Sequence, residues 1–323
     1  MKACVRRRYG SHNEISILDI ERPVPGKDQV LIKVSATTVN RTDCANLTGK
    51  PFIMHLLLGL VKPKRIGLGT DFAGTIIQKG TAVRQFELND RVFGFVDMGT
   101  NSQAEYLIIK ASDVYRIPEG IDFNTAAGAL EGAHYAYTFV HKVSIKAGQS
   151  VLINGATGGI GSALLQFVRE NDVHITATCN TENMSLIKSL GADEVIDYTK
   201  EDFTNKAHHF DFVFDAVGKS TFGKCRALLK PQGVYISSEL GPYSQNIFFA
   251  LYSLLFGKKK VIFPMPYAQK KTIPYISERL QKNTFKPLID RIYKFEDISQ
   301  AYKDVLRGEK IGNVIILLHE EER

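Results

Sequence analysis

The sequence predicts an α/β protein with two domains, one built on an antiparallel β-sheet and the other on a doubly wound parallel sheet. Three observations predict this fold class. A chain of 323 residues is longer than one hydrophobic core usually fills. Short alternating runs occupy residues 1–125, whereas strand patterns alternate with helical patterns beyond residue 150. We therefore expect one domain from 1–125 and 265–323, and an inserted domain from 126–264.

The first 125 residues contain short runs of alternating polarity. Gly, Pro, Asn and Asp separate these runs, which is typical of antiparallel strands joined by turns. Beyond residue 265 the chain has two helical patterns and a closing strand pattern at 312–318. The clearest strand patterns lie at 29–34, 72–77, 90–95 and 104–109.

The segment 150–161 predicts a buried strand, a glycine-rich turn and a helix that begins near Ile160. Gly158 lets the backbone approach a phosphate, and Gly161 lets the helix pack close to the strand. Ala156 stands where a G-x-G-x-x-G pattern has its first glycine. Because a helix N-terminus attracts anions, the segment predicts a dinucleotide site, with an ordinary strand-to-helix turn as the alternative. The expected contacts are Ala156, Thr157, Gly158, Gly159, Ile160 and Gly161.

The end of the second strand, 174–179, bears on the choice of cofactor. A site for NAD usually places a carboxylate here, about 20 residues after the glycines, to hold the ribose 2′-hydroxyl. Thr178, Cys179 and Asn180 are all neutral, which favours NADP(H). Asn183 is a further amide donor nearby.

The alternation continues along the inserted domain. We expect helices at 182–190 and 222–229, and strands within 191–198, 210–218 and 233–238. The run at 210–218 is apolar enough for a central parallel strand. In such sheets, ligands bind at the carboxyl ends of the strands.

Six motifs in this order resemble the zinc-free, quinone oxidoreductase-like branch of the medium-chain dehydrogenases/reductases, over essentially the whole chain. The resemblance implies a GroES-like catalytic domain, a Rossmann domain, an active site between them and hydride transfer from a nicotinamide. The motifs are TVNRTD at 38–43, GTDFAG at 69–74, NDRVFG at 89–94, NGATGGIG at 154–161, LGADEVIDY at 190–198 and GNV at 312–314.

The same resemblance predicts that no metal is bound. Zinc-dependent relatives have Cys and His ligands where this chain has Asn40 and Thr70, neither of which is a usual zinc ligand. The four cysteines lack C-x-x-C spacing, so we interpret them as free thiols in a reducing cytoplasm. They are Cys4, Cys44, Cys179 and Cys225.

By resemblance, Asn40 lies near the nicotinamide and donates to the substrate oxygen, although its amide could instead only fix the loop. Asp43 either bonds the nicotinamide ribose or relays a proton, or it caps the following helix. A tyrosine that several quinone reductases carry after this motif is replaced by Pro51. A proton-donor role for that tyrosine therefore does not transfer.

Further cofactor contacts are implied by the same matching. Asn183 and Tyr198 fall near the 2′-phosphate or adenosine, and Asn313 belongs to the closing motif. Val217 falls at the adenine edge, while Glu239, Leu240 and Phe263 fall near the nicotinamide. For Val217 and Phe263, plain core packing is the alternative.

Two apolar segments, 52–61 and 246–256, each precede a basic run. Both are too short to span a bilayer, which needs about 20 residues. Three interpretations remain open: a greasy substrate funnel, a surface that contacts a membrane or a second copy, and ordinary packing between domains.

The net charge of +7 suits an anionic cofactor, and no nucleic-acid-binding motif accompanies the dispersed basic residues. We therefore predict an NADPH-dependent, metal-free reductase of quinones or α,β-unsaturated, lipophilic carbonyl compounds. One alternative is a zinc-independent ketone/alcohol oxidoreductase. The other is an NADPH-binding protein without enzymatic activity, with a regulatory or RNA-binding role.

Overall fold

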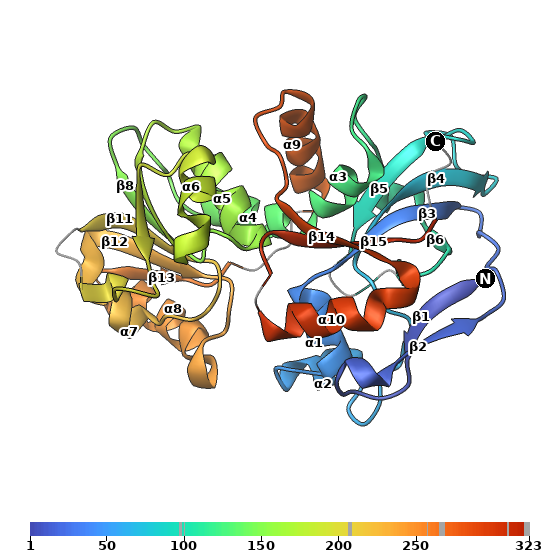
Figure 1. Ribbon diagram of the computed structural model, residues 1–323, viewed down its shortest axis with the longest axis horizontal. Coiled ribbons are helices and arrows are strands. Elements are labelled where there is room, and N and C mark those ends of the chain that lie inside the picture. The colour runs from blue at the N-terminus through green and yellow to red at the C-terminus, as the bar shows by residue number, and fades with distance from the viewer. Residues whose placement is uncertain are drawn as a thin grey trace. The chain divides into compact units, whose positions relative to one another are not determined.

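The computed structural model describes residues 1–96, 99, 101–205, 209–256, 258–264, 269–308 and 310–319, except the side chains at 254–256. The chain forms two compact units (Figure 1). Unit 1 consists of Met1–Glu131 and Ile273–Arg323, and unit 2 of Gly132–Thr272. An antiparallel sheet dominates unit 1 and a parallel sheet forms unit 2, which confirms the predicted fold class.

Unit 1 is organised around β3 (Gln29–Val39), most of whose residues are buried. It pairs antiparallel with three other strands, so both of its edges are used. A separate hairpin joins β1 (Lys2–Arg6) to β2 (Ile15–Asp19). The large sheet has the order β14 (Ile289–Lys294), β15 (Asn313–Leu317), β3, β4 (Asp71–Lys79), β5 (Arg91–Phe95) and β7 (Tyr115–Arg116), with β6 (Tyr106–Lys110) on β3.

Helices cover this sheet with their apolar faces. In α10 (Ile298–Arg307), the buried Ile298, Ala301, Tyr302 and Val305 recur at helical spacing and pack into the core of unit 1. The helix α3 (Phe123–Gly128) contacts β3 and β4, so the domain boundary that we expected at residue 125 falls inside an element of unit 1. The remaining helices are α1 (Arg41–Thr48), α2 (Ile53–Leu58) and α9 (Gln269–Gln281), which crosses into unit 1.

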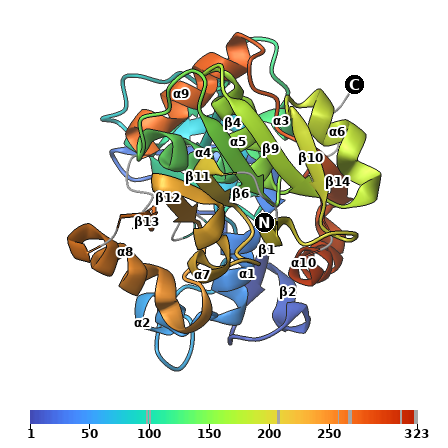
Figure 2. The same cartoon turned by 90° about the vertical axis from the view of Figure 1, so that its left-hand side faces the viewer.

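Unit 2 has one sheet of six parallel strands in which the first strand along the chain lies inside and later strands add outward on both sides. Figure 2 shows β10 and β13 at its opposite edges. This is the strand order of a dinucleotide-binding doubly wound fold. The order is β10 (Glu194–Asp197), β9 (His174–Cys179), β8 (Ser150–Asn154), β11 (Phe210–Asp215), β12 (Leu229–Ser237) and β13 (Lys260–Ile262).

The helices of unit 2 lie on both faces of its sheet, with α5 and α6 on one face and α7 and α8 on the other (Figure 1). The predicted helices at 182–190 and 222–229 are shorter than expected, because each is partly a 3-10 turn. The bounds are α4 (Glu131–His141, which begins in unit 1), α5 (Gly159–Arg169), α6 (Met184–Ser189), α7 (Phe222–Cys225) and α8 (Gln245–Phe256).

Candidate active site

Polar side chains gather at the carboxyl edge of the parallel sheet because the strand register aligns them. Asn154 lies opposite Asp215, and Asp215 lies opposite Ser237. The fully buried Asp215 carboxylate accepts hydrogen bonds from Asn154 Nδ2 at 2.9 Å, Gly218 N at 3.0 Å and the Tyr235 hydroxyl at 2.9 Å. Asp215 therefore ties three neighbouring strands together at the edge where a ligand is expected.

Thr178 belongs to the same polar chain. Its hydroxyl donates to Asn154 Oδ1 at 2.8 Å and accepts from Gly155 N at 2.9 Å, and its side chain is fully buried. The next residue, Cys179, is also fully buried. Thr178 thus fixes the start of the glycine turn, and its hydroxyl is already engaged within the protein.

The glycine turn between β8 and α5 leaves room for a phosphate on one side only. Gly155 has a φ of 80°, which favours glycine. A Cβ on Gly161 would lie 2.1 Å from Gly155 O, so a side chain there would collide with the turn. A Cβ on Gly158 would meet only Gly155 O, at 3.6 Å. Close packing inside and open space outside fit a pyrophosphate against the backbone.

The N-terminus of α5 adds donors to this turn. Gly158 is the N-cap residue and, having no side chain, makes no capping hydrogen bond to the first N–H groups of the helix. Ala156 and Gly161 are buried, whereas the residues between them, Thr157, Gly158, Gly159 and Ile160, are only partly buried. The backbone N–H groups at a helix N-terminus attract anions, so this turn can bind the pyrophosphate of a dinucleotide.

Asp197, at the end of β10, is a residue that sequence reasoning missed. Its carboxylate accepts from the hydroxyls of Thr181 and Thr199, and these bonds lower the pKa of Asp197 to about 2. Lys200 Nζ lies 3.5 Å from Asp197 Oδ2. Asp197 lies opposite Cys179 in the sheet, so the Lys200 ammonium that pairs with Asp197 lies near the neutral end of β9. In the sequence, its position at the end of the strand predicted within 191–198, directly before the turn, was the signal that could have indicated Asp197.

Asn180, Asn183 and Tyr198 lie in this region of unit 2. Asn183 Nδ2 donates to Asn180 Oδ1, so the two amides hold each other. Tyr198 N donates to Cys179 O at 3.1 Å, while about half of the Tyr198 side chain remains exposed. The exposed ring is accessible to a ligand, and its contact with the adenosine stays a prediction.

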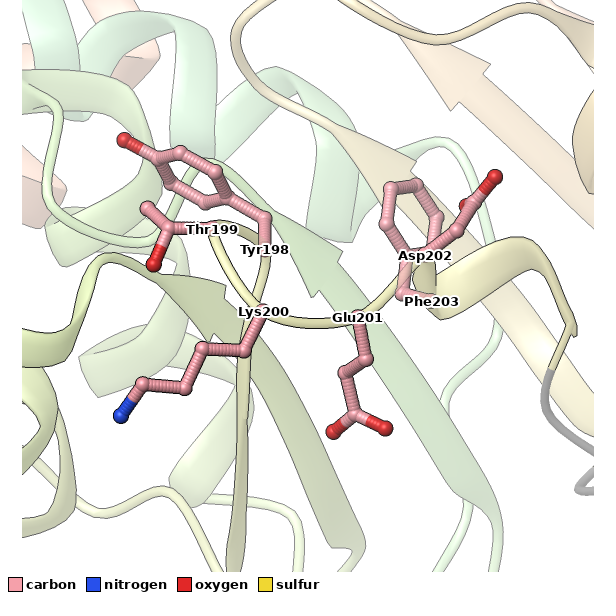
Figure 3. A pocket seen from close by; sticks show the side chains of 6 residues that line it. All are labelled: Tyr198, Thr199, Lys200, Glu201, Asp202 and Phe203. Atoms are coloured by element: carbon pink, nitrogen blue, oxygen red, sulfur yellow. The ribbon is translucent and has the colours of Figure 1, made fainter.

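A hollow of about 370 Å³ follows β10 and is lined by consecutive residues (Figure 3). Lys200 and Glu201 extend to the same side of the loop in this view. The hollow carries both a cation and carboxylates, so it is not a uniformly positive phosphate site. Its lining residues are Tyr198, Thr199, Lys200, Glu201, Asp202 and Phe203.

The residues expected near the adenine and nicotinamide follow β11, β12 and β13. A Cβ on Gly155 would come within 2.7 Å of Val217, so Val217 packs directly against the glycine turn. Glu239 packs against Gly218, and Asn246 Nδ2 donates to Glu239 O at 2.8 Å. Leu240 and Phe263 are partly buried. These four side chains lie at the ends of three adjacent strands.

Asn40 is the centre of a buried polar network in unit 1. It is the N-cap of α1, where its Oδ1 accepts from Asp43 N at 2.8 Å. Its Nδ2 donates to Thr70 Oγ1 at 2.7 Å and to Asp71 Oδ2 at 3.0 Å. Both ends of the amide are therefore engaged, and an additional role as donor to a substrate requires that one of these bonds opens.

Asp43 completes a capping box with Asn40. Its Oδ2 accepts from Asn40 N at 3.1 Å, and the side chain is fully buried. Burial, with the charge of Glu131 adding to it, raises the pKa of Asp43 well above its usual range. Asp43 occupies the third helical position, so in the structure it supports the cap that Asn40 makes.

Asp71 is a second buried acid in the network and was not predicted as a site residue. Its Oδ2 accepts from Thr38 Oγ1 at 2.5 Å, whereas its Oδ1 is buried without a partner. Burial and then the charge of Glu131 raise the pKa of Asp71 well above its usual range. The carboxyl therefore holds a proton more readily than an exposed aspartate does. The sequence signal was its place directly after Thr70.

Asn313 is the predicted cofactor residue that lies in unit 1. Its Nδ2 and its backbone N both donate to Leu288 O, at 3.0 and 2.8 Å, and its side chain is almost fully buried. It thus fixes the start of β15. Within the described parts of the chain, no group of three or more His, Cys, Asp or Glu side chains is placed to hold a metal ion.

Two family models match the chain. The model described as an alcohol dehydrogenase GroES-like domain matches residues 26–119, within unit 1. The model described as a zinc-binding dehydrogenase matches residues 190–316, from unit 2 into unit 1. Their order along the chain agrees with the order of the two large sheets.

Several known proteins are similar over most of the chain. A quinone-oxidoreductase homolog of Spinacia oleracea chloroplasts is 27% identical over 320 residues, with 95% of each chain covered. An NADPH-dependent alkenal/one oxidoreductase of Arabidopsis thaliana chloroplasts is 28% identical over 333 residues, with 98% of this chain and 79% of the relative covered. The solved structure of a quinone oxidoreductase from Coxiella burnetii shares the fold, with a TM-score of 0.87, 23% identity and 99% of each chain covered.

Proposed function

The chain belongs to the medium-chain dehydrogenase/reductase superfamily as a quinone oxidoreductase-like member, and from this premise we propose that it reduces quinones or α,β-unsaturated carbonyl compounds. The relatives are named as quinone and alkenal/one oxidoreductases, and the nicotinamide cofactor is a property of the superfamily. The observation that carries the proposal is the one-sided glycine turn at Gly155–Gly161, which fits a dinucleotide pyrophosphate.

Each part of the site has a distinct task in this proposal. When bound, a reduced nicotinamide supplies the hydride. The N–H groups at the start of α5 bind the pyrophosphate, and Val217 packs beside them. Asp215 keeps the three strand ends in register. Asn40 donates an amide N–H to the oxygen that gains charge, after releasing Thr70 or Asp71.

We propose NADP(H) as the preferred cofactor. The end of β9 carries no carboxylate to repel a 2′-phosphate, and Asn180 and Asn183 are amide donors there. Lys200 adds a positive charge near this end. The negative charge of Asp197 would repel a phosphate. Its oxygens, however, already accept hydrogen bonds from Thr181 and Thr199 and pair with the Lys200 ammonium.

We also propose that the reaction needs no zinc, because Asn40 and Thr70 are poor zinc ligands and bond to each other. The four cysteines are buried free thiols, which supports the proposed location in the cytoplasm. The substrate is a small lipophilic carbonyl compound or quinone, with no specific nucleic-acid partner. Sedimentation velocity measures whether two copies associate.

The test is turnover of NADPH with a panel of quinones, enones and saturated ketones. We expect oxidation of NADPH with quinones or enones, and a product reduced at C=C when the acceptor is an enone. Reduction at C=O of saturated ketones alone would favour the ketone/alcohol oxidoreductase. Tight NADPH binding without turnover of any acceptor would favour the non-enzymatic alternative.

A further inference from the structure

The segment 52–61 in unit 1 presents apolar side chains to solvent on a well-held backbone. Of these, Leu56 is 62% exposed and Val61 is 90% exposed. The backbone is fixed by the Tyr9 hydroxyl, which donates to Gly59 O at 2.8 Å, and by Lys64 N, which donates to Leu58 O at 2.9 Å. The exposed apolar residues are Phe52, Ile53, Leu56, Leu57, Leu60 and Val61. The fold of unit 1 therefore holds these apolar side chains at its surface.

Three cations follow this surface directly. Lys62, Lys64 and Arg65 are exposed, and none has an ion pair among the residues that the structure describes. The Arg65 carbonyl accepts from Arg6 Nη1 at 2.8 Å, so the basic run is held to the sheet domain by its backbone. Its charged side chains remain available to a partner.

Unit 2 carries the same combination on α8. Phe249 packs against Phe222, with ring centroids 5.4 Å apart, and the Ser253 hydroxyl accepts from Val261 N at 3.0 Å. The opposite face presents Ile247, Phe248, Leu251 and Tyr252, of which Phe248 is 66% exposed. Lys258, Lys259 and Lys260 follow, also without an ion pair in the described part of the chain. Two independent elements therefore pair an apolar face with a basic run.

We propose that these two apolar–basic surfaces, 52–65 and 247–252 with 258–260, bind the surface of an anionic phospholipid membrane. Apolar side chains enter the headgroup boundary, and the adjacent cations meet lipid phosphates. Burial of apolar side chains and attraction to anionic lipids both strengthen binding at a membrane surface, and each of the two surfaces supplies both. The net charge of +7 acts in the same direction.

A second copy of the chain fits these surfaces less well. A basic run that lies on the axis of a twofold contact meets its own symmetry mate, where like charges repel. A membrane with anionic headgroups neutralises the same cations. Within the described residues, no helix combines the length and apolar character that spanning a membrane requires.

The experiment measures binding of the full-length protein to vesicles by sedimentation. Vesicles of phosphatidylcholine alone are compared with vesicles that also contain phosphatidylglycerol, at low and high salt. We expect binding to the anionic vesicles that weakens with salt. Replacing Lys62 and Lys64 with Gln should lower the partition coefficient by roughly fivefold for each cation removed. Leu56→Ser with Leu57→Ser should lower it by at least about tenfold.

Matched controls separate this surface from charge and hydrophobicity in general. Lys142→Gln with Lys146→Gln removes the same charge from exposed positions elsewhere, and Val24→Ser with Leu88→Ser removes exposed apolar side chains. Both controls should bind vesicles like the unaltered protein, and circular dichroism should show that every variant is folded. The corresponding changes on α8, Phe248→Ser with Leu251→Ser, test unit 2 separately.

Three results would overturn the proposal. The first is no binding to the anionic vesicles. The second is equal losses in the surface and control variants. The third is unchanged vesicle binding in the surface variants together with the loss of another property. That property is either a dimer, measured by sedimentation velocity, or the rise of kcat/KM with substrate chain length. That third result would assign the surfaces to a second copy or to a substrate funnel. Vesicle sedimentation needs no cofactor, so the first two results are independent of the proposed reductase activity.

Discussion

At the scale of single residues, Asn40 combines two jobs that are usually separate. Its oxygen caps α1, and its amide nitrogen joins Thr70 and Asp71 on the neighbouring loop and strand. The first job stabilises a helix, and the second places an N–H donor inside a polar network. Substitutions that keep one job and remove the other can separate them.

We expect Asn40→Ser to keep the cap, because Ser is a favoured N-cap residue, and to lose the amide donor. Asn40→Ala loses both and should be less stable by about 1 kcal/mol. If Asn40 stabilises developing charge, both variants should lose about a hundredfold in turnover. Urea unfolding and steady-state kinetics measure the two effects. Full turnover in Asn40→Ser would restrict Asn40 to its structural role.

The raised pKa of Asp71 predicts the pH dependence of stability. Folded Asp71 holds its proton at pH values where the unfolded chain has released it, so the free energy of unfolding falls as pH rises above about 4. Asp71→Asn does not titrate and should flatten this fall by up to about 1.4 kcal/mol per pH unit. Urea unfolding between about pH 4.5 and 7 measures the slope.

Asp197→Asn is the matched control for that measurement. The pKa of Asp197 is lowered to about 2, so its contribution to stability is present above the unfolded pKa and is lost only as pH falls toward 2. Asp197→Asn should change the free energy of unfolding only at acidic pH and leave its slope against pH near neutrality unchanged. An unchanged slope in Asp71→Asn would show that Asp71 is ionised in the folded protein.

Cofactor choice also rests on single residues. Asn180→Asp places a carboxylate at the end of β9 and still accepts from Asn183. We expect NADPH binding to weaken by about tenfold through repulsion of the 2′-phosphate, with little change for NADH. Asn13→Asp adds the same charge at an exposed place in unit 1 and should have no effect. Titration calorimetry with both cofactors checks this, and equal affinities in the unaltered protein would contradict it.

At the scale of elements, two glycines in the turn between β8 and α5 differ in what a side chain would disturb. At Gly161 it would collide with the turn, and at Gly158 it would occupy the space proposed for the phosphate. Gly161→Ala places a Cβ 2.1 Å from Gly155 O, and we expect a loss of about 1–3 kcal/mol in stability. Gly158→Ala meets nothing closer than 3.6 Å and should cost at most about 1 kcal/mol. Its methyl group instead occupies the phosphate side and should weaken NADPH binding by about tenfold.

Thermal unfolding and calorimetry of both glycine variants separate stability from binding. If Gly158→Ala bound NADPH like the unaltered protein, the phosphate would have to lie elsewhere. If both variants lost stability equally, the turn would be closed on both sides. Either result contradicts the one-sided cradle.

At the scale of the whole molecule, one of the two matching family models is described as a zinc-binding dehydrogenase, whereas Asn40 and Thr70 stand where we expect the zinc ligands of zinc-dependent relatives. We expect elemental analysis to find no stoichiometric zinc and EDTA to leave turnover unchanged. A zinc-containing alcohol dehydrogenase treated in parallel should lose activity. One tightly bound zinc per chain would overturn the prediction.

Local patterns made part of this molecule predictable. The strand, turn and helix at 150–161 follow from glycines and apolar periodicity within twelve residues, and the structure has them as β8 and α5. Thr70 and Asp71, which accept from the Asn40 amide, lie 30 and 31 residues away, and Thr178 reaches back 24 residues to Asn154. Such pairings depend on the three-dimensional arrangement of loops, so the sequence indicated these residues without indicating what their polar atoms bond.

The central strand of unit 1 also constrains the order in which the chain acquires its structure. β3 spans Gln29–Val39, and its antiparallel partner β15 spans Asn313–Leu317. On a ribosome, which releases the N-terminus first, all of unit 2 emerges before β15 does. Until then β3 has one open edge along Ala36–Val39. An unpaired edge invites pairing with other chains, so translation of β15 removes a site of aggregation.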